Sequence, residues 1–220
     1  MKLALFDLDD TLLDGDSDFH WAQYLIERGV IDRGHYERRN ASFHGHYSSG
    51  TLDIHEYLAF QLGPLAGRPR EELDEWHRAF MAEKVRPLIH AKTPALLASH
   101  ADALVAIVTA TNSFVTGPIA RELGVGHLIA TEAEVAPDGR FTGRPAGTPA
   151  FREGKVARVR EWLDTLGHRF EDFTETWFYS DSHNDLPLLE LVSMPVAVDP
   201  DPLLEGRARE GGWPILRMRA

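Results

Sequence analysis

Two acidic clusters in the 220-residue chain have residue types and spacing suited to chemistry on a charged substrate. In the first, Asp7 and Asp9 directly follow the apolar run at residues 3–6. Side chains two residues apart on an extended backbone project to the same side, so both carboxylates can face one pocket. The second cluster, with Asp181 and Asp185, follows the apolar run at residues 177–180. Taken alone, the first cluster fits a solvated acidic loop about equally well.

Both clusters are expected at the carboxyl edge of a parallel sheet, where open α/β sheets bind their ligands. A carboxylate and a phosphate dianion about 4 Å apart repel by roughly 8 kcal/mol at an effective dielectric near 20. A hard divalent cation offsets that repulsion, and Mg²⁺ is favoured because it takes oxygen ligands and keeps several waters. Zinc is disfavoured, since the chain has no cysteine and no well-spaced set of histidines.

Two further residues have the chemistry of a phosphate site. Thr109 ends the apolar run at residues 104–108, where its hydroxyl can donate to a phosphoryl oxygen and the next helix can present backbone amides. Lys155 opens a helix after the loop at residues 147–154, where a cation can neutralise transferred charge. Considered separately, each has an ordinary interpretation, as a threonine at a strand end and as a solvated surface lysine.

The elements that must position these residues alternate short apolar runs with helical patterns. This alternation predicts an α/β fold with a parallel sheet and helices on both of its faces. An Asp-Gly pair between residues 134 and 142 also predicts a hairpin or tight turn. The predicted strands are residues 3–6, 103–108, 127–131, 177–180 and 194–198.

The stretch between the first two strands is too long for a plain loop and is expected to hold structure of its own. Apolar residues recur at helical spacing from Phe19 and stop at Gly29, which can take the left-handed conformation that follows a helix end. Further helical patterns cover residues 32–46 and 53–63, and a fourth begins at Pro69. This stretch is therefore predicted to be a helical unit.

The domain organisation follows from that insertion. Residues 15–85 are predicted to form a helical cap, and residues 1–14 and 86–220 to form the catalytic core. Linkers near Asp14 and Arg86 are expected to hinge the cap over the site and exclude water.

Composition limits the function classes. The net charge of −11 leaves no basic footprint for nucleic acid. No apolar stretch approaches the roughly eighteen residues that a membrane span needs, so no membrane partner is expected. The absence of cysteine excludes disulfides and cysteine-based phosphatase chemistry, and it favours the cytoplasm. The oligomeric state stays open.

In chain order, the motifs are Asp7-x-Asp9-x-Thr11, Thr109, Lys155, and Asp181 with Asp185. This order resembles the haloacid dehalogenase superfamily, specifically its phosphoserine phosphatase-like branch (subfamily IB), in which a helical cap follows the first motif. The resemblance covers nearly the whole chain. It implies a Rossmann-like three-layer core with a C1-type cap, and a Mg²⁺-dependent phosphatase that acts on a small phosphorylated metabolite.

The resemblance also implies roles for individual residues. Asp7 would attack phosphorus and form an aspartyl-phosphate, and Asp9 would protonate the leaving alcohol and later activate water. An acid at Asp9 argues against dehalogenation, because a halide needs no proton to leave. Thr109 and Lys155 would hold the phosphoryl oxygens. The implied metal residues are Asp7, Asp9 through its carbonyl, Asp181 and Asp185.

Few residues in the sequence bear on the identity of the substrate. In the phosphoserine phosphatases that the chain resembles, an acidic residue holds the substrate amine and a cap arginine holds its carboxylate. The acidic position falls on Asp16, and the arginine position falls on Ala59. This pattern favours an amino-alcohol phosphate such as histidinol phosphate. An Asp directly before a helix is, however, an ordinary N-cap, and this is the stronger interpretation of Asp16. Asn184 is a further candidate substrate residue.

Alternatives remain within and beyond this class. Phosphoserine phosphatase, a phosphotransferase or mutase that uses the same aspartyl-phosphate, and a non-catalytic phosphate-binding module all stay open. Aromatic residues of the insertion could form a slot for an imidazole, but most are interpreted as packing, because a small helical unit needs an aromatic core. They are Trp21, Tyr24, Phe43, Tyr47, Tyr57 and Phe60.

Overall fold

The computed structural model describes residues 1–219, in which seven strands form one sheet of order β4-β3-β2-β1-β5-β6-β7. All neighbouring strands run parallel except β3 and β4, which pair antiparallel as the predicted hairpin. The predicted α/β fold is confirmed. The strands are β1 (Lys2–Phe6), β2 (Ala103–Asn112), β3 (His127–Val135), β4 (Phe141–Ala146), β5 (Glu175–Ser180), β6 (Met194–Val198) and β7 (Ile215–Leu216).

The central strand β1 shows why the sheet is covered on both faces. Its successive side chains point to opposite sides, as in any strand. Ala4 and Phe6 belong to one buried cluster, whereas Leu3 and Leu5 belong to another. All four are fully buried. Fully buried apolar strands of this kind are typical of parallel sheets between two helical layers.

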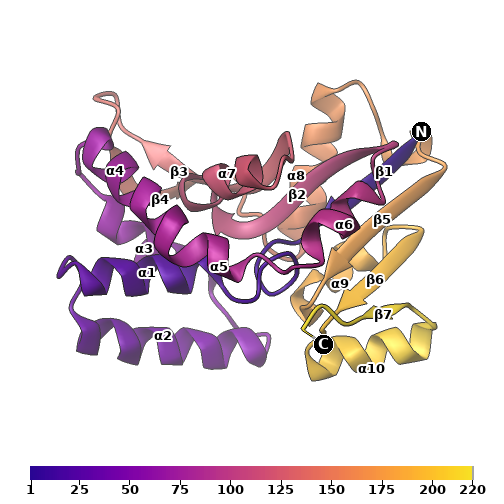
Figure 1. The fold of residues 1–220 in the computed structure, drawn as a ribbon, viewed down its shortest axis with the longest axis horizontal. Helices are drawn as coiled ribbons and strands as arrows, with labels where there is room; N and C mark the ends of the chain where they lie inside the picture. The colour runs from indigo at the N-terminus through magenta and orange to yellow at the C-terminus, as the bar shows by residue number, and fades with distance from the viewer. Residues whose placement is uncertain (220) are drawn as a thin grey trace.

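Helices from different parts of the chain form the two layers (Figure 1). The first buried cluster includes residues of α1 and α7, and the second includes residues of α8, α9 and α10. The helices of the core are α6 (Thr93–Ala98), α7 (Ser113–Glu122), α8 (Glu153–Thr165), α9 (Leu186–Leu189) and α10 (Pro202–Gly211), with short 3₁₀ turns at Phe170–Asp172 and His183–Asp185.

The long segment between β1 and β2 is helical, as predicted. It holds α1 (Ser17–Glu27), α2 (Arg33–Ser48), α3 (Ile54–Leu62), a 3₁₀ turn (Gly63–Leu65), α4 (Arg70–Phe80), a π-helical turn (Met81–Val85) and α5 (Arg86–Leu88). Gly29, with a φ of 71°, follows the end of α1 in the expected left-handed conformation. In Figure 1, α1 and α2 lie at the lower left, away from α10 at the lower right.

The two ends of this segment meet. Leu13 and Ile89 form an isolated antiparallel bridge, and the backbone N–H of Asp14 donates to the carbonyl of Leu88 at 2.6 Å. The chain therefore leaves the core and returns to it at nearly one point, close to the predicted hinges. The assignment of residues 15–85 as a separate cap stays a prediction.

One boundary differs from the sequence prediction in a way that matters for the site. We expected Thr109 at the end of its strand, but β2 continues to Asn112. The pairing with β3 shifts register between Thr109 and Asn112. Such an irregularity bends a strand and re-aims its side chains. Thr109 and Thr111 both line the cavity described below.

Candidate active site

The nucleophile candidate, Asp7, lies directly after β1. Its backbone N–H donates to the carbonyl of Tyr179 at 2.9 Å, which fixes the residue at the carboxyl edge of the sheet. Lys155, near the start of α8, places Nζ 2.8 Å from Asp7 Oδ1 and 2.6 Å from Asp185 Oδ2. Ser180 also donates to Asp185 Oδ2, at 2.7 Å. Three of the residues predicted from separate motifs thus form one buried ion-pair group.

Burial dominates the electrostatics of this group. It raises the pKa of Asp7 to about 7, and the charge of Lys155 opposes that shift. For Lys155, burial lowers the pKa, but the carboxylates of Asp185 and Asp7 outweigh it, so its pKa lies above the usual range. The lysine therefore stays charged. The surface-lysine interpretation is wrong, because the Lys155 side chain is only 3% exposed.

Asp9 is held from two sides. The backbone N–H of Ser17, the first residue of α1, donates to Asp9 Oδ1 at 2.7 Å, and the hydroxyl of Thr111 donates to Oδ2 at 2.8 Å. Burial, followed by the charge of Asp16, raises the pKa of Asp9 to about 7. A carboxyl group with this pKa can both give and take a proton near neutral pH.

Sequence reasoning did not single out Thr111. A signal was available, because Thr109 and Thr111 are two residues apart on an extended strand and so share a face. Thr109 is buried and accepts a hydrogen bond from the backbone N–H of Thr111 at 3.1 Å. Among residues 1–219, no group accepts the hydroxyl proton of Thr109. That proton can therefore be donated to a substrate oxygen.

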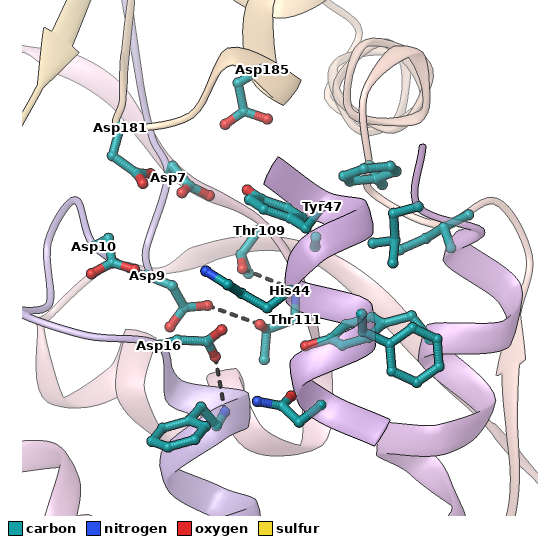
Figure 2. A pocket seen from close by; sticks show the side chains of 18 of the residues that line it. Asp7, Asp9, Asp10, Asp16, His44, Tyr47, Thr109, Thr111, Asp181 and Asp185 are labelled. Carbon is teal, nitrogen blue, oxygen red and sulfur yellow. Dashed lines mark hydrogen bonds between the residues drawn. The ribbon is translucent and has the colours of Figure 1, made fainter. Parts of the chain in front are cut away.

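Asp181 completes the acidic side of the site. In Figure 2, its side chain points toward Asp7. Burial, with repulsion from Asp7, Asp10 and Asp185, raises the pKa of Asp181 well above its usual value. The hydroxyl of Thr11 donates to Asp181 at 3.3 Å.

The donor set fits a hard cation, although the side chains do not form a closed cage. Four carboxylates gather around one lysine, so buried negative charge is in excess. Across residues 1–219, no three histidine or acidic side chains are grouped closely enough to make a ready metal centre. Mg²⁺ suits this arrangement, because it needs only one or two carboxylates and keeps waters. Asp185 is already bonded to Lys155 and Ser180, so its carboxylate supports the lysine.

These residues face a cavity of about 520 Å³ between the sheet edge and the insertion helices (Figure 2). The polar end is formed by the acidic residues, the two threonines and Lys155. The remaining wall is largely aromatic and aliphatic, and it comes mostly from α2 and α3. Its apolar lining residues are Phe19, Tyr36, Ala41, Phe43, Tyr47, Leu52, Ile54, Tyr57, Ala110 and Phe151.

The two candidate substrate residues have different positions. Asp16 caps α1 by accepting the backbone N–H of Phe19 at 2.9 Å, and it also lines the cavity. Asp16 is therefore the N-cap of α1, and its role toward the substrate amine stays a prediction. Asn184 does not line the cavity. Its side chain accepts from Arg152 Nε at 2.9 Å and donates to the carbonyl of Tyr47 at 3.4 Å, so it bonds α2 to the core.

The aromatic residues of the insertion divide between the two roles considered from sequence. Trp21 and Tyr24 are buried in the core, whereas Phe43, Tyr47 and Tyr57 line the cavity. Tyr47 also donates its hydroxyl to Ser182 at 2.8 Å.

The family model for haloacid dehalogenase-like hydrolases matches residues 4–190. The chain belongs to this family. It is 46% identical to a histidinol-phosphatase of Neisseria meningitidis serogroup C, over 99% of each chain. It is 33% identical to a phosphoserine phosphatase of Mycobacterium tuberculosis, over 98% of this chain and 70% of the relative. The predicted superfamily and its phosphoserine phosphatase-like branch are confirmed.

Solved structures agree with this family assignment. A protein of unknown function from Bordetella pertussis Tohama I has a TM-score of 0.91 and 48% identity, covering 98% of this chain and 97% of its own. A substrate-bound phosphoserine phosphatase has a TM-score of 0.68 at 19% identity, covering 98% and 92%, and shows a shared fold. The prediction that this haloacid dehalogenase-like hydrolase is an enzyme of the phosphatase class is confirmed. No helix within residues 1–219 has the length and apolar character of a membrane span.

Proposed function

We propose that the protein is a Mg²⁺-dependent phosphatase that hydrolyses a small amino-alcohol phosphate, histidinol phosphate, through an aspartyl-phosphate on Asp7. The observation that carries this proposal is the buried group of Asp7, Lys155 and Asp185 at the floor of an acidic and aromatic cavity. Asp9 stands at the same floor with a pKa of about 7.

The reaction has two steps. An oxygen of Asp7 attacks phosphorus, the bond between phosphorus and the ester oxygen breaks, and protonated Asp9 gives its proton to the leaving alcohol. In the second step, ionised Asp9 takes a proton from water, which attacks phosphorus and releases inorganic phosphate from Asp7. Lys155 and the free hydroxyl proton of Thr109 hold the phosphoryl oxygens in both steps.

The residues that would hold Mg²⁺ are Asp7, Asp181 and the backbone carbonyl of Asp9. When bound, the ion supplies compensation for the negative charge of substrate and carboxylates. Asp185 keeps Lys155 in place through the 2.6 Å contact between Lys155 Nζ and Asp185 Oδ2. Loss of Asp185 would free the lysine to move away from Asp7.

Three features support a substrate with an amine and without a carboxylate. Asp16 presents a carboxylate to the cavity. No arginine within residues 1–219 lines this cavity, and the sole lysine in its lining, Lys155, is already paired with two aspartates. Ala59, at the expected arginine position, lies on an exposed part of α3. The similarity to a histidinol-phosphatase supports the imidazole-bearing member of this substrate class.

The insertion helices would act as a cap at residues 15–85 that closes over the phosphoryl group. The aromatic wall from α2 and α3 supports this role, because it covers the polar floor. The cytoplasm is the compartment that suits a chain without cysteine and a small phosphorylated metabolite.

Phosphate release from histidinol phosphate, phosphoserine and phosphoethanolamine, each with Mg²⁺ and with chelator, tests the proposal. We expect Mg²⁺-dependent turnover that is fastest with histidinol phosphate and is abolished in Asp7→Asn. Asp102→Asn, an exposed residue paired with Lys2 at the far end of β1, is the matched control and should retain activity. Turnover that survives Asp7→Asn would contradict the mechanism, and product ester formed with an added alcohol would favour the phosphotransferase alternative.

A further inference from the structure

A polar network is built into the apolar wall of the cavity. Gln61, on α3, is only 5% exposed, and its Nε2 donates to the hydroxyl of Tyr57 at 2.8 Å. On α2, the hydroxyl of Tyr36 donates to Asn40 Oδ1 at 3.5 Å. Both tyrosines and Asn40 line the cavity, whereas Gln61 lies behind it. Buried polar groups need partners, so such a network fixes the orientation of its members.

The two tyrosine hydroxyls differ in whether the hydroxyl proton already has an acceptor within the protein. Tyr36 has an acceptor within the protein, Asn40 Oδ1, at 3.5 Å. Tyr57 accepts from Gln61, and no group in residues 1–219 accepts the Tyr57 proton. Because a phenol has one proton to donate, Tyr57 offers a free, pre-oriented donor to whatever occupies the cavity.

The surrounding charge determines which acceptor can use this donor. Burial, followed by the charges of Asp16 and Asp18, raises the pKa of Tyr57 well above its usual value, so the phenol keeps its proton. A carboxylate acceptor would be repelled by the same two aspartates. A neutral acceptor, such as the unprotonated nitrogen of an imidazole, carries no such penalty. An imidazole is mostly neutral near pH 7, since its pKa is about 6.5.

We propose that Tyr57 selects the substrate by donating its hydroxyl proton to an unprotonated ring nitrogen, and that Gln61 is the positioning residue that aims this hydroxyl. This inference rests on the proposed function. It names the residue that distinguishes a nitrogen-containing ring from a hydrocarbon ring of the same shape. Asp16 would hold the amine between the phosphoryl group and the ring.

The test compares two esters that differ only in the ring. Histidinol phosphate carries an imidazole, and 2-amino-3-phenylpropyl phosphate carries a phenyl group with the same amine and phosphate. In wild type, we expect kcat/KM to favour the imidazole ester by at least about tenfold, the value of one hydrogen bond whose buried donor is otherwise left unpaired. Tyr57→Phe should remove this preference by raising KM for the imidazole ester alone.

Two further variants separate recognition from packing. Tyr36→Phe loses a hydroxyl from the same wall but no free donor, so it should keep the wild-type preference even if its melting temperature falls. Gln61→Met should lower the preference in the same direction as Tyr57→Phe, with kcat for the phenyl ester unchanged.

The outcomes distinguish this inference from the proposed function. If wild type hydrolyses histidinol phosphate and Tyr57→Phe keeps the preference for the imidazole ester, Tyr57 does not recognise the ring nitrogen. The inference is then overturned. The same conclusion follows if Tyr36→Phe loses the preference equally. If wild type hydrolyses neither ester but releases phosphate from another ester, histidinol phosphate is not the substrate. The proposed role of Tyr57 in recognising the ring is then overturned as well.

Discussion

The hydrogen bond from Thr111 to Asp9 gives a sharp test of the acid–base mechanism. Thr111→Val removes one hydroxyl, the donor that lies 2.8 Å from Asp9 Oδ2, and changes the shape of the side chain little. A donor to a carboxylate stabilises its ionised form, so its loss raises the pKa of Asp9 above about 7. Hydrogen bonds to charged groups contribute about 1.5–3 kcal/mol.

The lower end of that range applies, because Asp9 is partly exposed to the cavity. Since about 1.4 kcal/mol is a factor of ten, the ionised form of Asp9 should become about tenfold rarer relative to the protonated form. The second step needs ionised Asp9, whose fraction at pH 7 falls from about one half to about one eleventh, so hydrolysis of the aspartyl-phosphate at pH 7 should slow about fivefold. The first step needs protonated Asp9, so its activity should persist to higher pH. The whole pH profile should therefore move to higher pH.

The assay is the pH dependence of kcat for phosphate release, with melting temperature measured in parallel. Thr116→Val is the matched control, because Thr116 is fully buried but donates to the carbonyl of Asn112 and does not contact Asp9. Superimposable profiles for wild type and Thr111→Val would refute the assignment of Asp9 as acid and base. An equal displacement in Thr116→Val would show that the effect is structural.

Three other predictions follow from the same geometry. Lys155→Met leaves Asp7 and Asp185 buried without their cation, so we expect a loss of about 3–5 kcal/mol in the free energy of unfolding, measured by denaturant titration, and at least a hundredfold loss of kcat; wild-type stability would contradict the ion-pair account. Folding raises the pKa values of Asp7, Asp9 and Asp16 from 3.8 to about 7, 7 and 6. Between pH 3.8 and about pH 7, the folded protein therefore binds more protons than the unfolded chain. The metal-free protein should therefore lose thermal stability as pH rises through this window, and the gain from Mg²⁺ should grow over the same window; a metal gain independent of pH would count against these shifts. Asp16→Asn should raise KM for histidinol phosphate about tenfold and leave an ester without an amine nearly unchanged, while equal effects on both esters would reduce Asp16 to a helix cap.

Much of the fold was predictable because local pattern and tertiary environment agree. The run at residues 3–6 is apolar throughout, and β1 is the buried central strand that such a run predicts. Gly29 ends α1 as expected. The two-residue strand β7 was missed, since a single pair of apolar residues carries no periodicity.

The residues at the floor of the site were predictable for a different reason. Asp7 and Asp181 follow parallel strands, and the carboxyl ends of such strands meet at one edge. The contact of Lys155 with two aspartates depends on the packing of α8, which no local signal specifies. Asn184 shows the opposite case. It is a candidate substrate residue from sequence, and its side chain is bonded to Arg152, a contact that no local pattern predicts; its substrate role stays a prediction.

The cavity wall was the least predictable part. Tyr57 and Gln61 are one helical turn apart, which is ordinary for packing, and only the structure reveals that one hydroxyl keeps an unused proton. Aromatic residues of the insertion serve as core and as cavity lining at once, so composition alone could not separate these roles.

The most direct test of the central claim is to identify the phosphorylated residue during turnover. Wild-type enzyme is mixed with Mg²⁺ and histidinol phosphate, quenched in acid, and digested for peptide mass analysis. We predict one added phosphoryl group on the peptide from the N-terminus, located at Asp7 and absent from Asp7→Asn. Turnover with no phosphorylated Asp7, or with the phosphoryl group on another residue, would contradict the account.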